Sequence, residues 1–143
     1  MKKLGILLIL VLVIVGVTLM VSAAPPNAGR TYTVELSGAN EVPGPGDPDG
    51  SGVAVVTLNP GLGTACWEIS YENIGTPFAA HIHVGTADQS GGVVVPLFPP
   101  VESGCGPADP AIILEILRNP EGYYVNVHTP EFGAGAIRGQ LSQ

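Results

Sequence analysis

The chain has 143 residues and a formal net charge of −7 at pH 7, with 5 basic residues against 12 acidic ones. Both lysines lie at positions 2 and 3, so the rest of the chain carries three arginines and a net charge of about −9. Such a chain offers no basic patch for nucleic acid or for an anionic membrane surface. Its 20 glycines and 14 prolines favour turns and short strands over long helices.

The N-terminus has the pattern of a secretory signal peptide. Two lysines precede an apolar stretch over residues 4–21, and Val21-Ser22-Ala23 offers a cleavage site of small residues. The same stretch is close to the minimum length of a membrane-spanning helix. We therefore expect residues 1–23 to be a signal peptide or an N-terminal membrane anchor, and residues 24–30 to be a flexible lead-in. Residues 31–143 are then one secreted or extracytoplasmic domain, in contact with a membrane only through an uncleaved N-terminal segment.

Strand-like segments follow one another through this domain, separated by turns rich in glycine and proline. Alternating or β-branched apolar residues predict strands at 32–37, 53–58, 65–71, 78–84, 93–98, 123–129 and 136–141. One helix is expected from Pro110 to Leu117, with Asp109 as its N-cap and Asn119-Pro120 as its stop. Seven short strands and one short crossover helix predict an all-β fold, a Greek-key β-sandwich.

The sequence contains two cysteines, Cys66 and Cys105. In an exported chain an even number of cysteines predicts a disulfide bond, here closing a loop of about 40 residues worth roughly 3–4 kcal/mol. The alternative is a pair of metal thiolates. The two cysteines lack the close C-x-x-C spacing of such sites, so the disulfide is favoured.

The chain has three histidines, His81, His83 and His128. Residues two apart in a strand face the same side, so the first two imidazoles lie about 6.5–7 Å apart and can converge on one ion. His128 ends another expected strand and supplies a third ligand if the two strands are neighbours. Three imidazoles suit copper or zinc. The alternative is that the histidines only form hydrogen bonds on a polar face of the sheet.

Few other residues carry a chemical signal. Glu41 is a candidate fourth metal ligand and Glu131 another, although each falls in an expected loop or turn. Arg138 lies within a strand pattern and is expected to pair with an acidic residue at the sheet surface; an anion-guiding role beside a metal is the alternative. No serine lies in a nucleophile-elbow context, and the cysteines are expected to be paired, so no catalytic residue is predicted.

Five collinear segments resemble the CHRD domain, a module named after chordin and widespread in exported bacterial proteins. They are YTVELSGANEVP (32–43), AAHIHVG (79–85), GVVVPLF (92–98), YYVNVHT (123–129) and GAIRGQL (135–141). The resemblance spans the whole expected domain in order, which makes it far more specific than the H-x-H pair alone. It implies a single-domain CHRD-like β-sandwich over residues 31–143 and no settled activity.

A weaker resemblance is to copper–zinc superoxide dismutase, which also carries an H-x-H strand, a later strand histidine and an arginine near its end. His81, His83, His128 and Arg138 follow that order. This chain has no counterpart of the bridging histidine or of the zinc-loop ligands, so the resemblance implies at most one mononuclear site. The expected sandwich is accordingly immunoglobulin-like or superoxide-dismutase-like.

These observations predict an exported, non-enzymatic binding module that binds one copper or zinc ion through the three histidines. One alternative is an extracellular adhesion or protein-interaction domain without a metal, whose partner is a protein or a glycan. Another is a mononuclear copper redox enzyme that resembles a reduced dismutase. Because the imidazoles must be neutral to bind a metal, we expect binding to weaken below about pH 6.5.

Overall fold

The computed structural model describes residues 29–97, 99 and 101–142. The segment expected to be a signal peptide or anchor lies outside them. Within the described residues no helix has both the length and the apolar character that crossing a bilayer requires. This part of the chain contains one α-helix, two short 3₁₀ helices and eight strands: β1 (Arg30–Ser37), η1 (Gly38–Asn40), β2 (Ser51–Asn59), β3 (Thr64–Glu72), β4 (Ala79–Val84), β5 (Val93–Leu97), β6 (Ser103–Pro107), α1 (Pro110–Arg118), η2 (Pro120–Gly122), β7 (Tyr123–His128) and β8 (Ile137–Gln140).

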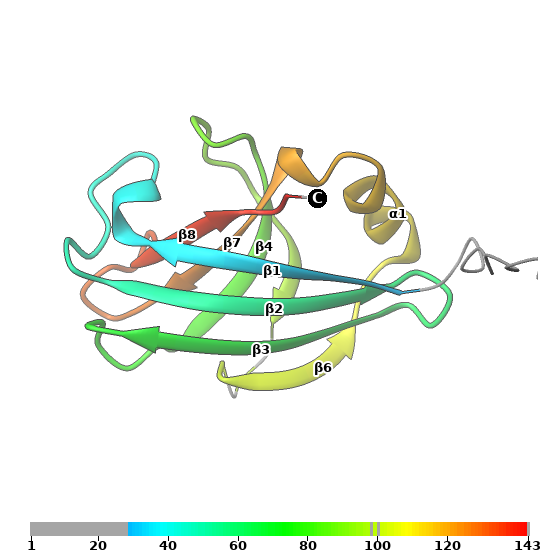
Figure 1. The fold of residues 1–143 in the computed structure, drawn as a ribbon, viewed down its shortest axis with the longest axis horizontal. Helices are drawn as coiled ribbons and strands as arrows, with labels where there is room; N and C mark the ends of the chain where they lie inside the picture. The colour runs from blue at the N-terminus through cyan, green and yellow to red at the C-terminus, as the bar shows by residue number, and fades with distance from the viewer. Residues whose placement is uncertain (1–28, 98, 100, 143) are drawn as a thin grey trace, which may run out of the picture.

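The strands form one antiparallel sheet in the order β5-β4-β7-β8-β1-β2-β3-β6. The sheet curls so far that it is nearly a barrel, with β1, β2, β3 and β6 in one layer and β4 and β7 behind them (Figure 1). The two layers meet where β8 pairs with β1, opposite each other at Ser37 and Arg138. The prediction of an all-β, sandwich-like fold with one helix is confirmed.

The core lies between the two layers. Strands β1, β2 and β3 bury every second residue, as the alternating sequence predicts, and leave the other face towards solvent. Helix α1 covers one end of the sandwich (Figure 1) and buries Ile113 and Ile116 completely. It begins as expected, because the Asp109 side chain accepts a hydrogen bond of 2.8 Å from the backbone N–H of Ala111.

The strand boundaries differ from the prediction by one or two residues, as the first and fifth strands show. Strand β1 begins at Arg30, and β5 ends at Leu97, while Phe98 lies outside the described residues. Strand β6 was not predicted, because its sequence SGCGP has neither alternation nor β-branched residues. It forms by pairing with β3, which places Cys105 directly opposite Cys66. The expected disulfide joins these two residues and ties β6 to the sheet.

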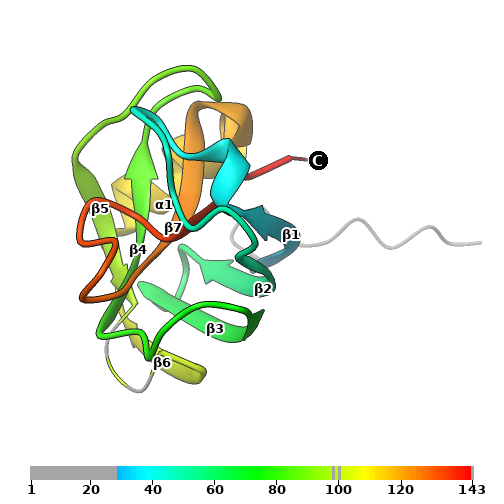
Figure 2. The ribbon, with the colours of Figure 1, turned by 90° about the vertical axis from the view of Figure 1, so that its left-hand side faces the viewer.

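The outer face of the β4–β7–β8 layer is covered by loops, unlike the outer face of β1–β3. All six residues of β7 are buried. Figure 2 views the end of the sandwich where the cyan segment after β1 and the orange-red segment after β7 gather. The cyan segment folds back on itself tightly, since the N–H of Gly38 donates to Gly50 O at 3.1 Å and a Cβ at Gly38 would collide with the backbone of Asp47. The loops create a sheltered polar face.

Candidate metal centre

The two histidines of β4 project to this sheltered face. Ile82, which lies between them in sequence, and Ala80, which precedes them, are fully buried in the core. Because side chains alternate along a strand, His81 and His83 point outwards. His83 is itself 9% exposed, because the covering loops lie over it.

Strand β7 brings the third histidine beside them. It pairs antiparallel with β4, with Asn126 opposite His81 and His128 opposite Ala79. Residues directly opposite each other share a face of the sheet, so His128 lies diagonally beside His81 on the outer face. The condition set by the sequence, that the two histidine-bearing strands be neighbours, is met.

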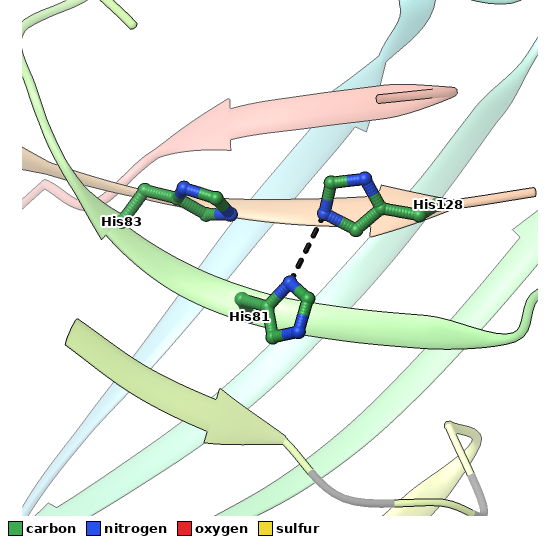
Figure 3. A group of neighbouring side chains, drawn as sticks. All are labelled: His81, His83 and His128. Carbon is green, nitrogen blue, oxygen red and sulfur yellow. Dashed lines mark hydrogen bonds between the residues drawn. The ribbon is translucent and has the colours of Figure 1, made fainter. Parts of the chain in front are cut away.

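The three imidazoles face one another in a compact group (Figure 3). Nδ1 of His81 lies 3.1 Å from Nε2 of His128. The ring centroids are 5.0 Å apart for His81 and His128, 5.5 Å for His81 and His83, and 5.8 Å for His83 and His128. One nitrogen from each ring lies within 4.8 Å of the other two, which makes these residues a candidate ligand set for a metal ion.

Backbone carbonyls fix the tautomer of two of these rings. Nδ1 of His83 lies 2.9 Å from Gly91 O, and Nδ1 of His128 lies 3.2 Å from Gly133 O. A carbonyl oxygen only accepts, so in the neutral rings both Nδ1 atoms carry the proton and both Nε2 atoms carry a lone pair. This is the arrangement that metal-binding histidines adopt, with the distal N–H held by a carbonyl or carboxylate.

The donor set fits a transition metal. Nε2 of His83 is buried and has no hydrogen-bond partner, an arrangement that costs free energy unless the nitrogen meets a ligand. Zinc or copper held tetrahedrally with metal–nitrogen bonds near 2.0–2.1 Å would place its nitrogen ligands about 3.3 Å apart. The present spacing therefore needs closing by at most about 1.5 Å, within the reach of side-chain adjustment.

Burial keeps the imidazoles neutral. It is the main cause that lowers the pKa of His81 to about 4, with further contributions from the charges of His128 and His83. Burial also lowers the pKa of His83 and that of His128, although in each case the backbone hydrogen bond acts the other way. Protons therefore compete for these nitrogens only at a lower pH than the ordinary histidine pKa of about 6.5 implies.

Glu41 belongs to a neighbouring polar cluster. It follows η1, is 8% exposed, and accepts a hydrogen bond of 3.2 Å at Oε2 from Nδ2 of Asn126. Burial is the main cause that raises the pKa of Glu41 to about 7, although Asn126 and Arg138 lower it. The close group of ligand atoms consists of the three histidines, so the role of Glu41 as a fourth ligand stays a prediction. Glu131 is exposed in the loop after β7.

Arg138 does not lie at the sheet surface, contrary to the sequence-based expectation. It is 1% exposed, and its Nη2 donates to Thr86 O at 2.7 Å and to Gln89 O at 2.9 Å. Its guanidinium carbon lies 3.4 Å from the centroid of the Tyr124 ring. The expectation was wrong because the loop between β4 and β5 folds back over β8 and supplies carbonyl acceptors that the local sequence does not reveal.

Several residues of the site were missed in the sequence. Tyr124 and Asn126 share the outer face of β7 with His128, at positions four and two residues before it. The sequence does contain a signal for them: Tyr124, Asn126 and His128 are polar and two residues apart, which predicts that they share one face of the strand. The roles of Gly91 and Gly133 had no signal, because they act through their carbonyl groups.

The family model of the CHRD domain matches residues 32–141. No curated protein and no solved structure matches the chain.

Proposed function

The chain belongs to the CHRD domain family, and we propose that it is an extracytoplasmic, non-enzymatic module that binds one copper or zinc ion through His81, His83 and His128. One observation carries the proposal. Two of the three rings commit Nδ1–H to a backbone carbonyl, which leaves a lone pair on Nε2 of His83 and of His128. The lone pair of His128 accepts from Nδ1–H of His81 at 3.1 Å, a hydrogen bond that coordination of an ion would replace. A group of histidines that only satisfied one another would not leave Nε2 of His83 buried without a partner.

The surroundings support a resident ion at neutral pH. The three pKa values are lowered, so the rings are neutral at pH 7 and their ionisation to imidazolium does not compete with metal binding. Three neutral imidazoles leave the charge of a divalent ion unneutralised, and a fourth position remains for water or a small ligand. The disulfide and the expected signal segment support an oxidising compartment outside the cytoplasm.

The test is the metal content of the chain. The protein is produced with its own N-terminal segment in a host that exports it, offered equal amounts of copper and zinc, desalted, and analysed by mass spectrometry. We expect about one equivalent of one metal per chain, as a single three-histidine site implies. The metal that is retained identifies the ion.

Substitution of a ligand supplies the second half of the test. His128→Gln keeps a side chain that can donate to Gly133 O but removes the imidazole, and we expect metal affinity to fall at least about 100-fold. Glu41→Gln is the matched comparison and separates three-histidine binding from binding that includes a carboxylate. A folded, disulfide-bonded chain that retains no metal, or an H128Q variant that binds like the wild type, would refute the proposal.

A further inference from the structure

The segment between β4 and β5 is fastened to the outer face of the sheet by side chains of β8. Nε2 of Gln140 donates to Gly85 O at 2.7 Å, and Arg138 donates to two further carbonyls of the segment, those of Thr86 and Gln89. These bonds hold the start and the middle of the segment. Its far end, at Gly91, is held by other groups.

Gly91 connects this segment to the metal centre. Its carbonyl accepts from Nδ1 of His83 at 2.9 Å, and its N–H donates to the hydroxyl of Tyr124 at 3.2 Å. The residue lies so close to the backbone of Val84 that a Cβ would collide with it, so the approach requires glycine. The peptide groups flanking Gly91 therefore link the tyrosine hydroxyl to the imidazole of His83.

Tyr124 also touches His83 directly. The two rings are nearly parallel, with an interplanar angle of 10° and centroids 5.0 Å apart. Tyr124 is 2% exposed, and the guanidinium of Arg138 packs against its ring. The tyrosine ring is thus fixed by its own packing, and it presents both a flat surface and a hydroxyl to the surroundings of His83.

We propose that Tyr124 is a positioning residue of the metal centre, which sets the orientation and the tautomer of His83 by ring stacking and through Gly91. This inference rests on the proposed function, since it concerns how strongly the same site binds its ion. A ring held in one orientation with Nδ1 protonated offers Nε2 to the ion without further ordering. Partners of this kind, which do not touch the metal, commonly account for a 10–100-fold change in affinity.

Two adjacent tyrosines provide the matched experiment. Tyr124→Phe removes the hydroxyl that holds Gly91 and keeps the ring. Tyr123→Phe removes a hydroxyl next to it in sequence, which donates to Oε2 of Glu115 at 3.5 Å and belongs to a side chain on the core face of β7, away from the face of the histidines. In competition titrations of the full chain with a chelator and copper or zinc, we expect about 10-fold weaker binding for Y124F and unchanged binding for Y123F.

A second measurement works without a metal. Nitrogen NMR of the histidine rings in the metal-free chain reports which nitrogen of His83 carries the proton. We expect Nδ1 protonation in the wild type and in Y123F, and a mixture of tautomers in Y124F. If the chain bound no metal but Y124F mixed the tautomers, the proposed function would fail while the positioning role stood. Equal affinity and equal tautomers in Y124F and the wild type, or equal losses in both variants, would overturn the inference.

Discussion

The two layers of the sandwich treat their outer faces differently. Strand β2 alternates between buried and partly exposed residues, whereas all six residues of β7 are buried. The outer face of β7 carries Tyr124, Asn126 and His128, all polar, and each has a hydrogen-bonding partner from a loop or a neighbouring strand. The covered layer therefore holds the three histidines and the buried polar side chains around them.

The difference between the two layers concerns the free-energy cost of burying polar side chains. Burying a polar side chain is unfavourable unless every group finds a partner. On the covered face, however, each of four residues has a buried polar side-chain atom without a hydrogen-bond partner. These residues are Glu41, His83, Asn126 and Arg138. The open layer has a partnerless buried atom at Tyr32 alone among the described residues. Four of these five unpartnered polar atoms therefore lie on the same face as the three histidines.

The largest effect should come from the disulfide in the open layer. Replacing Cys66 and Cys105 together by serine removes a link across a sequence separation of 39 residues, and we expect the free energy of unfolding to fall by about 3–4 kcal/mol. Urea denaturation measures this change. Because the disulfide bond lies away from the histidines, we expect the metal affinity of the folded variant to differ from that of the wild type by less than about 2-fold. A parallel loss of metal affinity would show that the two layers are not independent.

The sequence predicted the open layer well because one face of each of its strands meets the core. Period 2 in residues 32–37 and 65–71 is a direct record of that burial. Strand β6 escaped prediction, since pairing with β3 and a disulfide hold it rather than its own residue pattern.

The covered layer was predicted only in part. His81 and His83 follow from strand periodicity, and His128 from its position at the end of a strand. Arg138 was expected at the surface, and the partners of the histidines were not expected at all, because both depend on loops returning over the sheet. Such long-range loop contacts leave no periodic signal in the sequence.

The stability of the chain should depend on pH through Glu41, which belongs to the covered layer. Its pKa in the folded chain is raised to about 7, so the folded state holds a proton that the unfolded state releases near pH 4.5. The wild type should therefore lose stability as pH rises from about 4.5 to about 7, by roughly 1–2 kcal/mol after allowance for solvent screening. Glu41→Gln lacks this loss, so its stability relative to the wild type should rise over the same range.

The measurement is the free energy of unfolding of both proteins, without metal, at pH 5 and pH 8. The histidines titrate in both proteins, so their contribution cancels in the difference. A difference between the variant and the wild type that stays constant from pH 5 to pH 8 would mean that the carboxyl of Glu41 is not held protonated by burial.

The smallest expected effect on the free energy of unfolding comes from replacing one tyrosine by phenylalanine in each layer. Tyr71 lies in β3 of the open layer, and its hydroxyl donates to Oε1 of Glu102 at 2.8 Å in an exposed position. Because water replaces that partner, Tyr71→Phe should cost at most about 0.5 kcal/mol of unfolding free energy. Tyr124→Phe removes the hydroxyl that accepts from the N–H of Gly91 in the covering segment, a partly buried hydrogen bond, and should cost about 1 kcal/mol. Urea denaturation of the two variants in one buffer compares the layers directly. Equal losses of unfolding free energy in the two variants would mean that the loops over β7 admit water as freely as the open face of β3. That result would contradict the conclusion that the histidine site is sheltered from solvent.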